Sequence, residues 1–161
     1  MALSLADDLT AEGHFGIYRL YSDGRRELRQ QVKNIVVNQG LFQMLDNAIG
    51  SGAIIDYFAW GRSGVDVNGS PVAKVAASSG LTTQNGSKAI ASTARSANVL
   101  NVYGTIATTE GNTPGSINEF GLFASGTEAV NRFFAMQSFA TELKDSTFAL
   151  QFEYALTLNQ V

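Results

Sequence analysis

The chain has 161 residues, of which 45% are hydrophobic and 16% are charged, and its formal net charge is −3. A chain of this length most simply forms one domain, and its low charge and ten phenylalanines exclude general disorder. Acids and bases are mixed, so nothing favours binding to nucleic acid or to an anionic membrane. The absence of cysteine excludes disulfides and thiolate metal sites, and no apolar run is long enough to span a bilayer.

The first 13 residues are polar and acidic, with three apolar anchors: Leu3, Leu5 and Leu9. Two interpretations are open, a frayed terminus or an arm that docks these leucines on a neighbouring subunit. The segment has no basic stretch and no long apolar run, so we expect no signal peptide and folding in a cytosol. We therefore divide the chain into an N-terminal arm at 1–13 and one domain at 14–161.

A β-hairpin is predicted next, with strands over residues 14–21 and 25–33 and turn chemistry in Ser22-Asp23-Gly24. The second strand carries several cations, among them Arg25, Arg26 and Arg29. These arginines form either a solvated face or a contact surface for an acidic partner.

The only predicted helix covers residues 39–49. Asn38 can cap it, because its side-chain oxygen can accept from the free amides of the first turn. Apolar residues at helical spacing are Leu41, Leu45, Ala48 and Ile49. Gly50 fits the left-handed position after a helix end, and a strand follows over residues 54–60.

Residues 61–97 differ in composition, being rich in Gly, Ser, Ala and Thr and free of aromatic residues. Asn68-Gly69 and Asn85-Gly86 predict tight hairpin turns, because both residue types tolerate positive φ. The stretch is too long for a simple connection. We interpret it as a long surface excursion with short strand fragments, which contact with another subunit could order.

Strand character returns over residues 99–108, and after a turn at 109–116 three further strands are predicted over 117–158. In the last strand every second residue is apolar, and we call this set the apolar parity of the strand: Phe148, Leu150, Phe152, Tyr154, Leu156 and Leu158. Side chains alternate faces along a strand, so this strand has one buried and one wet face, as in antiparallel sheets. The predicted fold is mainly β, an antiparallel, jelly-roll-like β-sandwich with one short α-helix near residues 39–49.

Candidate catalytic residues are few. His14 is the only histidine, which excludes multi-histidine metal sites, and no Gly-x-Ser-x-Gly elbow is present. Asp56 and Glu119 lie inside apolar strands and are the carboxylates to consider for glycoside hydrolysis. A structural role is favoured for both, since a buried carboxylate usually finds backbone amides or a cation. We expect no enzyme activity, no cofactor and no metal.

Several motifs occur in a distinctive order. Residues 34–41 lead into the helix, residues 58–61 end a strand in glycine, and residues 117–123 have the pattern Ile-x-Glu-x-Gly-Leu-Phe. A Phe-rich strand at 132–139, Lys144 in a charged turn and the alternating strand at 148–158 complete the order. Over residues 32–158 the chain thereby resembles a family of small tailed-bacteriophage virion proteins. It departs from the family at residues 60–64, where a more regular Gly-rich turn is expected.

The resemblance implies a structural protein of the virion, of the kind described as tail-fibre, baseplate or head-decoration components. The short chain, the lack of a heptad or collagen-like shaft and the N-terminal arm favour a capsid decoration (cement) protein on the head shell. Its expected partners are the major capsid protein or other virion proteins, and further copies of itself in a dimer or trimer. The expected contact residues are Leu3, Leu5, Leu9, Arg25, Arg26 and Arg29.

Two other functions stay open. One is a tail-fibre, baseplate or adaptor component of the phage tail, built on the same fold. The other is a carbohydrate-binding module, in which Trp60 with Tyr57 or Tyr103 would form an aromatic platform. Because Trp60 ends an apolar strand, burial is favoured over display.

Overall fold

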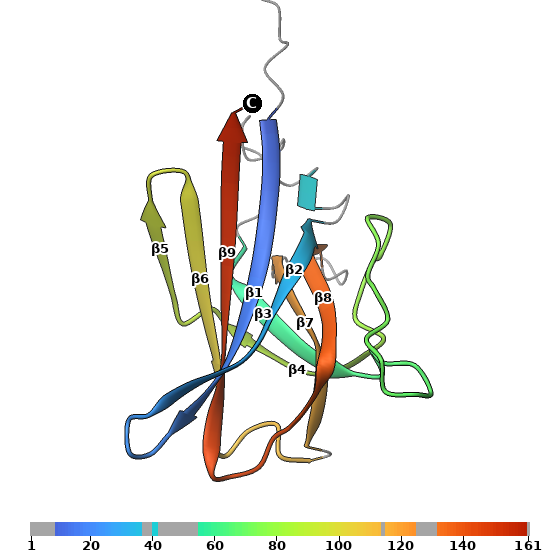
Figure 1. Ribbon diagram of the computed structural model, residues 1–161, viewed down its shortest axis with the longest axis vertical. Helices are drawn as coiled ribbons and strands as arrows, with labels where there is room; N and C mark the ends of the chain where they lie inside the picture. Colours follow the sequence, from blue (N-terminus) through green and yellow to red (C-terminus); the bar gives the residue numbers. More distant parts are fainter. Residues whose placement is uncertain (1–8, 37–39, 42–54, 114, 125–131, 161) are drawn as a thin grey trace, which may run out of the picture.

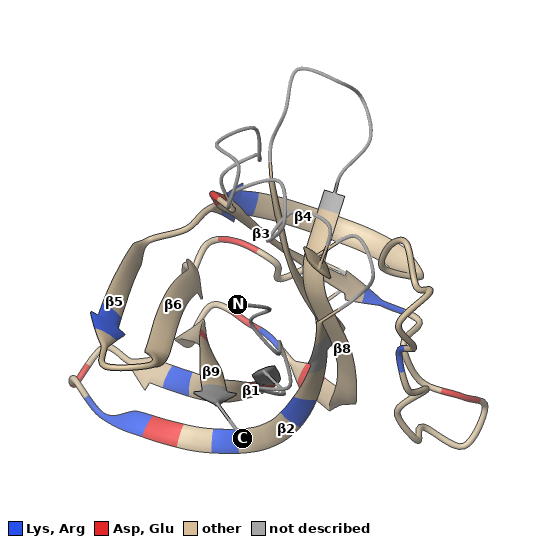
Figure 2. Ribbon diagram, turned by 90° about the horizontal axis from the view of Figure 1, so that it is seen from above, with Lys and Arg blue, Asp and Glu red and all other residues tan. Residues whose placement is uncertain are grey.

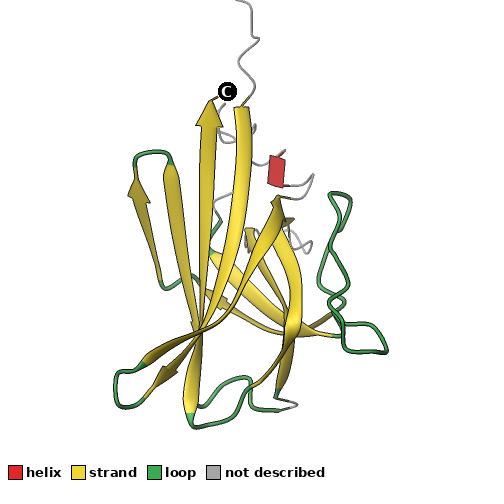
Figure 3. Cartoon of the chain, viewed as in Figure 1, coloured by secondary structure: helices red, strands yellow, loops and turns green. Residues whose placement is uncertain are grey.

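The described part of the chain is mainly β-strand (Figure 3). The computed structural model describes residues 9–36, 40–41, 55–113, 115–124 and 132–160. The strands are β1 (Leu9–Tyr21), β2 (Arg26–Val36), β3 (Tyr57–Arg62), β4 (Thr83–Ala89), β5 (Ser92–Ser96), β6 (Val99–Ile106), β7 (Ser116–Ala124), β8 (Arg132–Leu143) and β9 (Phe148–Gln160).

All the strand pairs are antiparallel, in the order β4-β3-β7-β8-β2-β1-β9-β6-β5. Two sheets share β2, the strand at which the order turns from one sheet to the other (Figure 1). Its residues from Arg26 to Asn34 pair with β1, and Ile35 and Val36 pair with β8. The mainly β prediction is therefore confirmed, with nine strands among the described residues.

The predicted alternation of the last strand is confirmed in β9, which lies between β1 and β6. Its apolar parity is buried from Phe148 to Leu156, while the other parity is half-buried. Phe152 stacks on Phe120 of β7 with ring centroids 4.1 Å apart, and Phe15 of β1 meets Phe120 edge-on at 4.7 Å. One core cluster thus takes side chains from β1, β6 and β9 and from β3, β7 and β8.

The predicted first hairpin is also confirmed. Ser22-Asp23-Gly24 forms the turn between β1 and β2, with Gly24 at a φ of 84°. Asn68-Gly69 is likewise a turn, with Gly69 at a φ of 80°.

The predicted turn at Asn85-Gly86 is wrong, because both residues lie inside β4. Gly86 pairs with Trp60 of β3, and a Cβ on Gly86 would lie 2.4 Å from the Trp60 ring. Gly86 therefore lets the indole ring of Trp60 pack directly against the backbone of β4. The spacing of residues in the sequence does not reveal this contact.

The two halves of the stretch at 61–97 differ. Residues 83–96 form β4 and β5, the two edge strands of the order, so the prediction of short strand fragments is confirmed there. Residues 63–82 contain one isolated bridge, Val65 to Pro71, and extend away from the sheets (Figure 1). We call residues 63–82 the projecting loop.

The predicted helix at 39–49 lies outside the described residues apart from Gly40 and Leu41, and it stays a prediction. Among the helical residues that the structure describes, none belongs to a segment long and apolar enough to cross a bilayer.

Candidate interaction site

The base of the projecting loop is held by one buried carboxylate. Glu119 of β7 has no exposed surface, and it forms an ion pair with the ammonium group of Lys74. The same carboxylate accepts hydrogen bonds from the Thr82 hydroxyl at 2.7 Å and from the Thr82 amide at 2.9 Å. The Thr83 amide adds a longer bond at 3.3 Å. A charge removed from water needs such partners, so Glu119 joins the middle and the end of the loop to β7.

A second attachment holds the beginning of the loop. The Gly64 amide donates to the side-chain oxygen of Asn118 at 2.9 Å, and Asn118 donates to the Thr141 hydroxyl at 3.2 Å. A Cβ on Gly64 would lie 2.3 Å from Cγ of Glu119, so only glycine lets the backbone approach this closely. The loop is therefore fixed to β7 at its start, middle and end.

The tip of the loop is a tight turn built on Asp66. Its Oδ1 accepts the backbone amides of Asn68 at 2.8 Å and Ser70 at 2.9 Å, the usual way in which Asp stabilises a turn. Val67, next to Asp66, has its whole side chain in solvent, at 101% relative exposure.

Exposed apolar side chains concentrate on this loop. Six large hydrophobic residues are exposed in the described part of the chain, and three of them, Val67, Val72 and Val75, belong to the projecting loop. Exposed apolar side chains that gather on one attached loop make this loop a candidate for contact with another protein.

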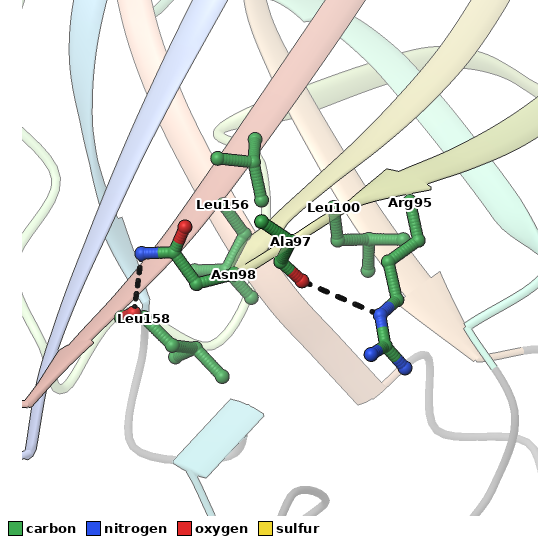
Figure 4. A pocket seen from close by; sticks show the side chains of 7 residues that line it. Arg95, Ala97, Asn98, Leu100, Leu156 and Leu158 are labelled. Atoms are coloured by element: carbon green, nitrogen blue, oxygen red, sulfur yellow. Dashed lines mark hydrogen bonds between the residues drawn. The ribbon is translucent and has the colours of Figure 1, made fainter.

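A pocket of about 330 Å³ lies at the opposite edge of the structure, where β6 and β9 meet the end of β5 (Figure 4). Val99, Leu100, Leu156 and Leu158 form its apolar wall, and Arg95 stands at its rim. The floor is nearly free of polar groups, so the pocket suits an apolar side chain or small molecule.

Two hydrogen bonds shape the rim of the pocket. Asn98 donates its side-chain amide to the Leu158 carbonyl at 2.8 Å, which ties the β5–β6 turn to β9. Arg95 donates Nε to the Ala97 carbonyl at 3.4 Å, a long bond. Arg95 makes no ion pair with any residue that the structure describes, so its charge is available at the rim.

The predicted contact arginines lie at and beyond the β1–β2 turn, and each has a neighbour of its own. The Arg25 guanidinium lies 4.0 Å from the Tyr21 ring centroid. Arg26 lies 3.5 Å from the Tyr18 ring centroid and forms an ion pair with Glu153 at 2.8 Å. The two ring contacts lie within the hairpin, and the pair with Glu153 joins the hairpin to β9.

Arg29 belongs to a network of alternating charges. It pairs with Glu27 at 2.6 Å and with Glu142 of β8 at 3.4 Å, and Arg19 also reaches Glu142, at 2.8 Å. The hydrogen bonds that the Tyr21 hydroxyl and the Arg29 guanidinium donate to Glu27 lower the pKa of its carboxyl, and the bond that Arg29 donates raises the pKa of Arg29. Figure 2 shows basic and acidic segments following one another along β2. The hairpin is thus a set of paired charges, and its role in binding a partner stays a prediction.

Of the three predicted arm leucines, the structure describes Leu9. Leu3 and Leu5 lie outside the described residues. Leu9 is the first residue of β1 and pairs in register with Gln160 of β9, so the strand begins within the range assigned to the arm.

Asp56 and Glu119 do not form a catalytic pair. In the β3–β7 register Gly61 lies opposite Glu119, and Asp56 comes five residues before Gly61. The two backbone positions are therefore about 17 Å apart along the strands, beyond the roughly 5–9.5 Å between glycosidase carboxyl groups. Glu119 instead has the structural role that was favoured for it.

The three aromatic residues considered for a sugar-binding platform do not lie together on one exposed face. Trp60 is only 7% exposed, as favoured from its place in the sequence, and its ring packs against Phe58. Tyr57 and Tyr103 are half-buried and lie on different sheets, β3 and β6.

Sequence reasoning missed Lys74 and the pocket. A signal for Lys74 was present, since it is the only cation in residues 63–82 and Glu119 interrupts an apolar strand. A buried acid and an isolated base far apart in sequence are natural partners. The pocket has no such signal, because its leucines follow the ordinary alternation of β6 and β9.

Within the part of the chain that the structure describes, no three His, Asp or Glu side chains gather in a way that could hold a metal ion. Comparison with protein-family models, with curated proteins and with solved structures finds no match to this chain.

Proposed function

We propose that the chain is a non-enzymatic structural protein of a tailed-bacteriophage virion, most simply a capsid decoration (cement) protein that stabilises the head shell. The order of sequence motifs from Asn34 to the alternating strand at 148–158 motivates the virion assignment. The observation that carries the structural role is the projecting loop, which combines a buried anchor with an exposed apolar tip.

The construction of this loop favours contact over catalysis. Burying Glu119 with Lys74 is expensive in desolvation, and a loop that only connected β3 to β4 would not need such a pair. A loop already fixed in place loses little conformational freedom on binding, so more of its contact energy contributes to affinity. The exposed Val67, Val72 and Val75 would supply that contact.

A jelly-roll-like sandwich of the two sheets is part of this proposal. The core cluster supports it, since Phe15 and Phe152 of one sheet pack against Phe120 of the other. A rigid two-layer body repeated over a shell would add subunit contacts at every site. An interface of standard size at each site stabilises the assembled shell by mass action.

The proposed partners are the major capsid protein or other virion proteins. The arm with Leu3, Leu5 and Leu9 and the hairpin arginines Arg25, Arg26 and Arg29 belong to the proposed contact surface together with the projecting loop.

Co-sedimentation tests the proposal. The purified protein is mixed with mature, tail-free capsids and, separately, with purified tails of the same phage. We expect saturable binding to capsids, weakened about tenfold or more by Val67→Asp and unchanged by Leu143→Asp. Leu143 is the matched control, since it is an exposed leucine at 69% exposure on β8 and outside the loop.

The arm is tested in the same assay with a deletion of residues 1–8, which stops before β1 begins at Leu9. Loss of capsid binding in this variant would assign the arm to the contact. Binding to tails alone would overturn the decoration function in favour of a tail-fibre, baseplate or adaptor component. Binding to neither would overturn the virion role and return attention to a carbohydrate-binding module, whose platform would have to form without Trp60.

A further inference from the structure

We propose that the tip of the projecting loop of one copy binds the apolar pocket of a second copy, so that the protein assembles head to tail with itself. The inference rests on the proposed function in one respect, namely that the projecting loop is a contact for assembly. It does not require a capsid, and it names the partner of the tip as this same chain.

The tip and the pocket lie on opposite sides of the molecule. The projecting loop extends beyond β4 on one side, whereas β5 and β6 lie on the other, and this holds in both views (Figures 1 and 2). A tip cannot occupy the pocket of its own chain from there, so any contact between the two joins different copies.

The tip presents one apolar side chain and one negative charge. Val67 is fully exposed, and both turn hydrogen bonds to Asp66 end on Oδ1. No residue that the structure describes bonds to Oδ2 of Asp66. The other charge of the loop, Lys74, is buried and paired with Glu119, so the exposed part of the loop is net negative.

The pocket presents the complementary pair of properties. Its wall is formed by aliphatic side chains: Leu156 lies beside Leu100 on the neighbouring strand, and Leu158 follows two residues later on β9 (Figure 4). Arg95 at its rim uses only Nε, in the long bond to Ala97, and leaves the two terminal nitrogens without a partner among the described residues. The valine of the tip therefore suits the apolar pocket, and the carboxylate beside the valine suits the guanidinium at the rim of the pocket.

A contact between two different patches has a consequence for the assembly. Such heterologous contacts generate a closed ring when the rotation closes and an open filament when it does not. An open chain of copies keeps one free tip at one end and one free pocket at the other. The contact buries one turn of one loop, so it is smaller than a standard interface and weak for a single pair of copies.

Sedimentation velocity of the purified protein, in a concentration series up to about 1 mM, tests the inference, since contacts of this strength become visible in that range. We expect association that Val67→Asp and Arg95→Glu each weaken by about tenfold or more. Leu143→Asp is the control, being an exposed leucine outside tip and pocket, and it should leave the association unchanged.

Mixing the two variants gives the sharpest result. Copies with Arg95→Glu keep an intact tip, and copies with Val67→Asp keep an intact pocket. A mixture should therefore form a one-to-one dimer and nothing larger, although each variant alone stays monomeric. A contact between two tips would instead leave the Arg95→Glu copies dimeric on their own and give no dimer between the two variants, which would overturn the inference.

The remaining outcomes separate this inference from the proposed function. The wild-type protein could stay monomeric at all concentrations while Val67→Asp abolishes capsid binding. The tip would then bind another virion protein, so the inference would fail and the proposed function would stand. Association that responds to Val67→Asp and not to Arg95→Glu places the tip elsewhere on the second copy and also overturns it. Head-to-tail association without binding to capsids or tails supports the inference and overturns the function.

Discussion

Two ion pairs in this protein differ in their surroundings. At the base of the projecting loop, the side chains of Glu119 and Lys74 are 0% and 10% exposed. At the first hairpin, those of Glu153 and Arg26 are 25% and 43% exposed. Both pairs join segments far apart in sequence, but the pair of Glu119 and Lys74 is shielded from water and salt, whereas the pair of Arg26 and Glu153 is open to both.

The comparison shows how the same chemistry serves two purposes. A pair in water contributes little, because hydration competes with it and mobile ions screen it. A buried ion pair holds its two segments in one arrangement, because separating the partners would leave each of them as an unpaired buried charge. The loop is therefore fixed by its ion pair, whereas the hairpin is fixed by its strand pairing and its charges stay adjustable.

The largest effect is expected from Lys74→Met. It leaves the Glu119 carboxylate buried without its cation, which should lower the free energy of unfolding by about 3–5 kcal/mol. Lys88→Met is the control, because Lys88 pairs with Glu110 at the surface and its loss should matter little. Denaturant unfolding followed by circular dichroism measures both.

Adding Glu119→Leu to Lys74→Met sharpens this test. With both charges gone no buried charge lacks a partner, so the double variant should recover part of the lost stability. The recovery stays incomplete, because the Thr82 hydroxyl and the Thr82 and Thr83 amides lose their acceptor. A Lys74→Met protein as stable as the wild type would show that the pair does not hold the loop.

A smaller loss is expected from Gly64→Ala. The new Cβ would lie 2.3 Å from Cγ of Glu119 and would displace the carboxylate from its partners. We expect a loss of about 1–3 kcal/mol in unfolding free energy. Gly80→Ala is the matched control in the same loop, since its Cβ would meet nothing closer than 3.9 Å. Equal stabilities of the two variants would contradict close packing at Gly64.

Arg26→Gln should have an effect of about 1 kcal/mol or less, because its pair with Glu153 is open to solvent. The effect should shrink further in concentrated salt, whereas that of Lys74→Met should change little. Thermal unfolding at low and high ionic strength compares the two. A loss at Arg26 as large as that at Lys74 would remove the distinction between the two ion pairs.

The smallest effect is expected in acid, from Glu27. Its pKa in the folded protein is lowered below the ordinary value of 4.5 by the Tyr21 hydroxyl and by Arg29. A lowered pKa means that the unfolded chain binds the proton more readily, so this contribution is present above about pH 4.5 and is lost as the pH falls through the folded pKa. Glu27→Gln should flatten the fall of unfolding free energy below that pH, and an unchanged slope would contradict the assignment.

Much of the fold could be predicted from the sequence where a pattern is local. The alternation from Phe148 to Leu158 identified β9, and Ser22-Asp23-Gly24 identified the turn of the first hairpin. In both places the residues that determine the structure are neighbours along the chain.

The features that escaped prediction depend on partners far away in sequence. Gly86 looked like a turn residue, but it lies in a strand because Trp60 packs on it from β3. Lys74 drew no prediction from the sequence, because its partner Glu119 lies on β7, 45 residues later. In the same way, an edge strand as polar as β4 has no alternation of its own, because most of its side chains are exposed.

The pairing of β1 with β9 has a consequence for the time course of folding. Leu9 lies opposite Gln160 and Tyr21 opposite Phe148, so the longest ladder of the protein joins its earliest and latest strands. Contacts so distant along the chain slow folding, because a large loop must close before any of them forms. On the ribosome, the first hairpin must wait with one edge unpaired until residue 160 has been made, and β6 waits for the same strand. Synthesis at roughly 5–20 residues per second makes that exposure last for seconds, the period in which the nascent chain is most open to aggregation.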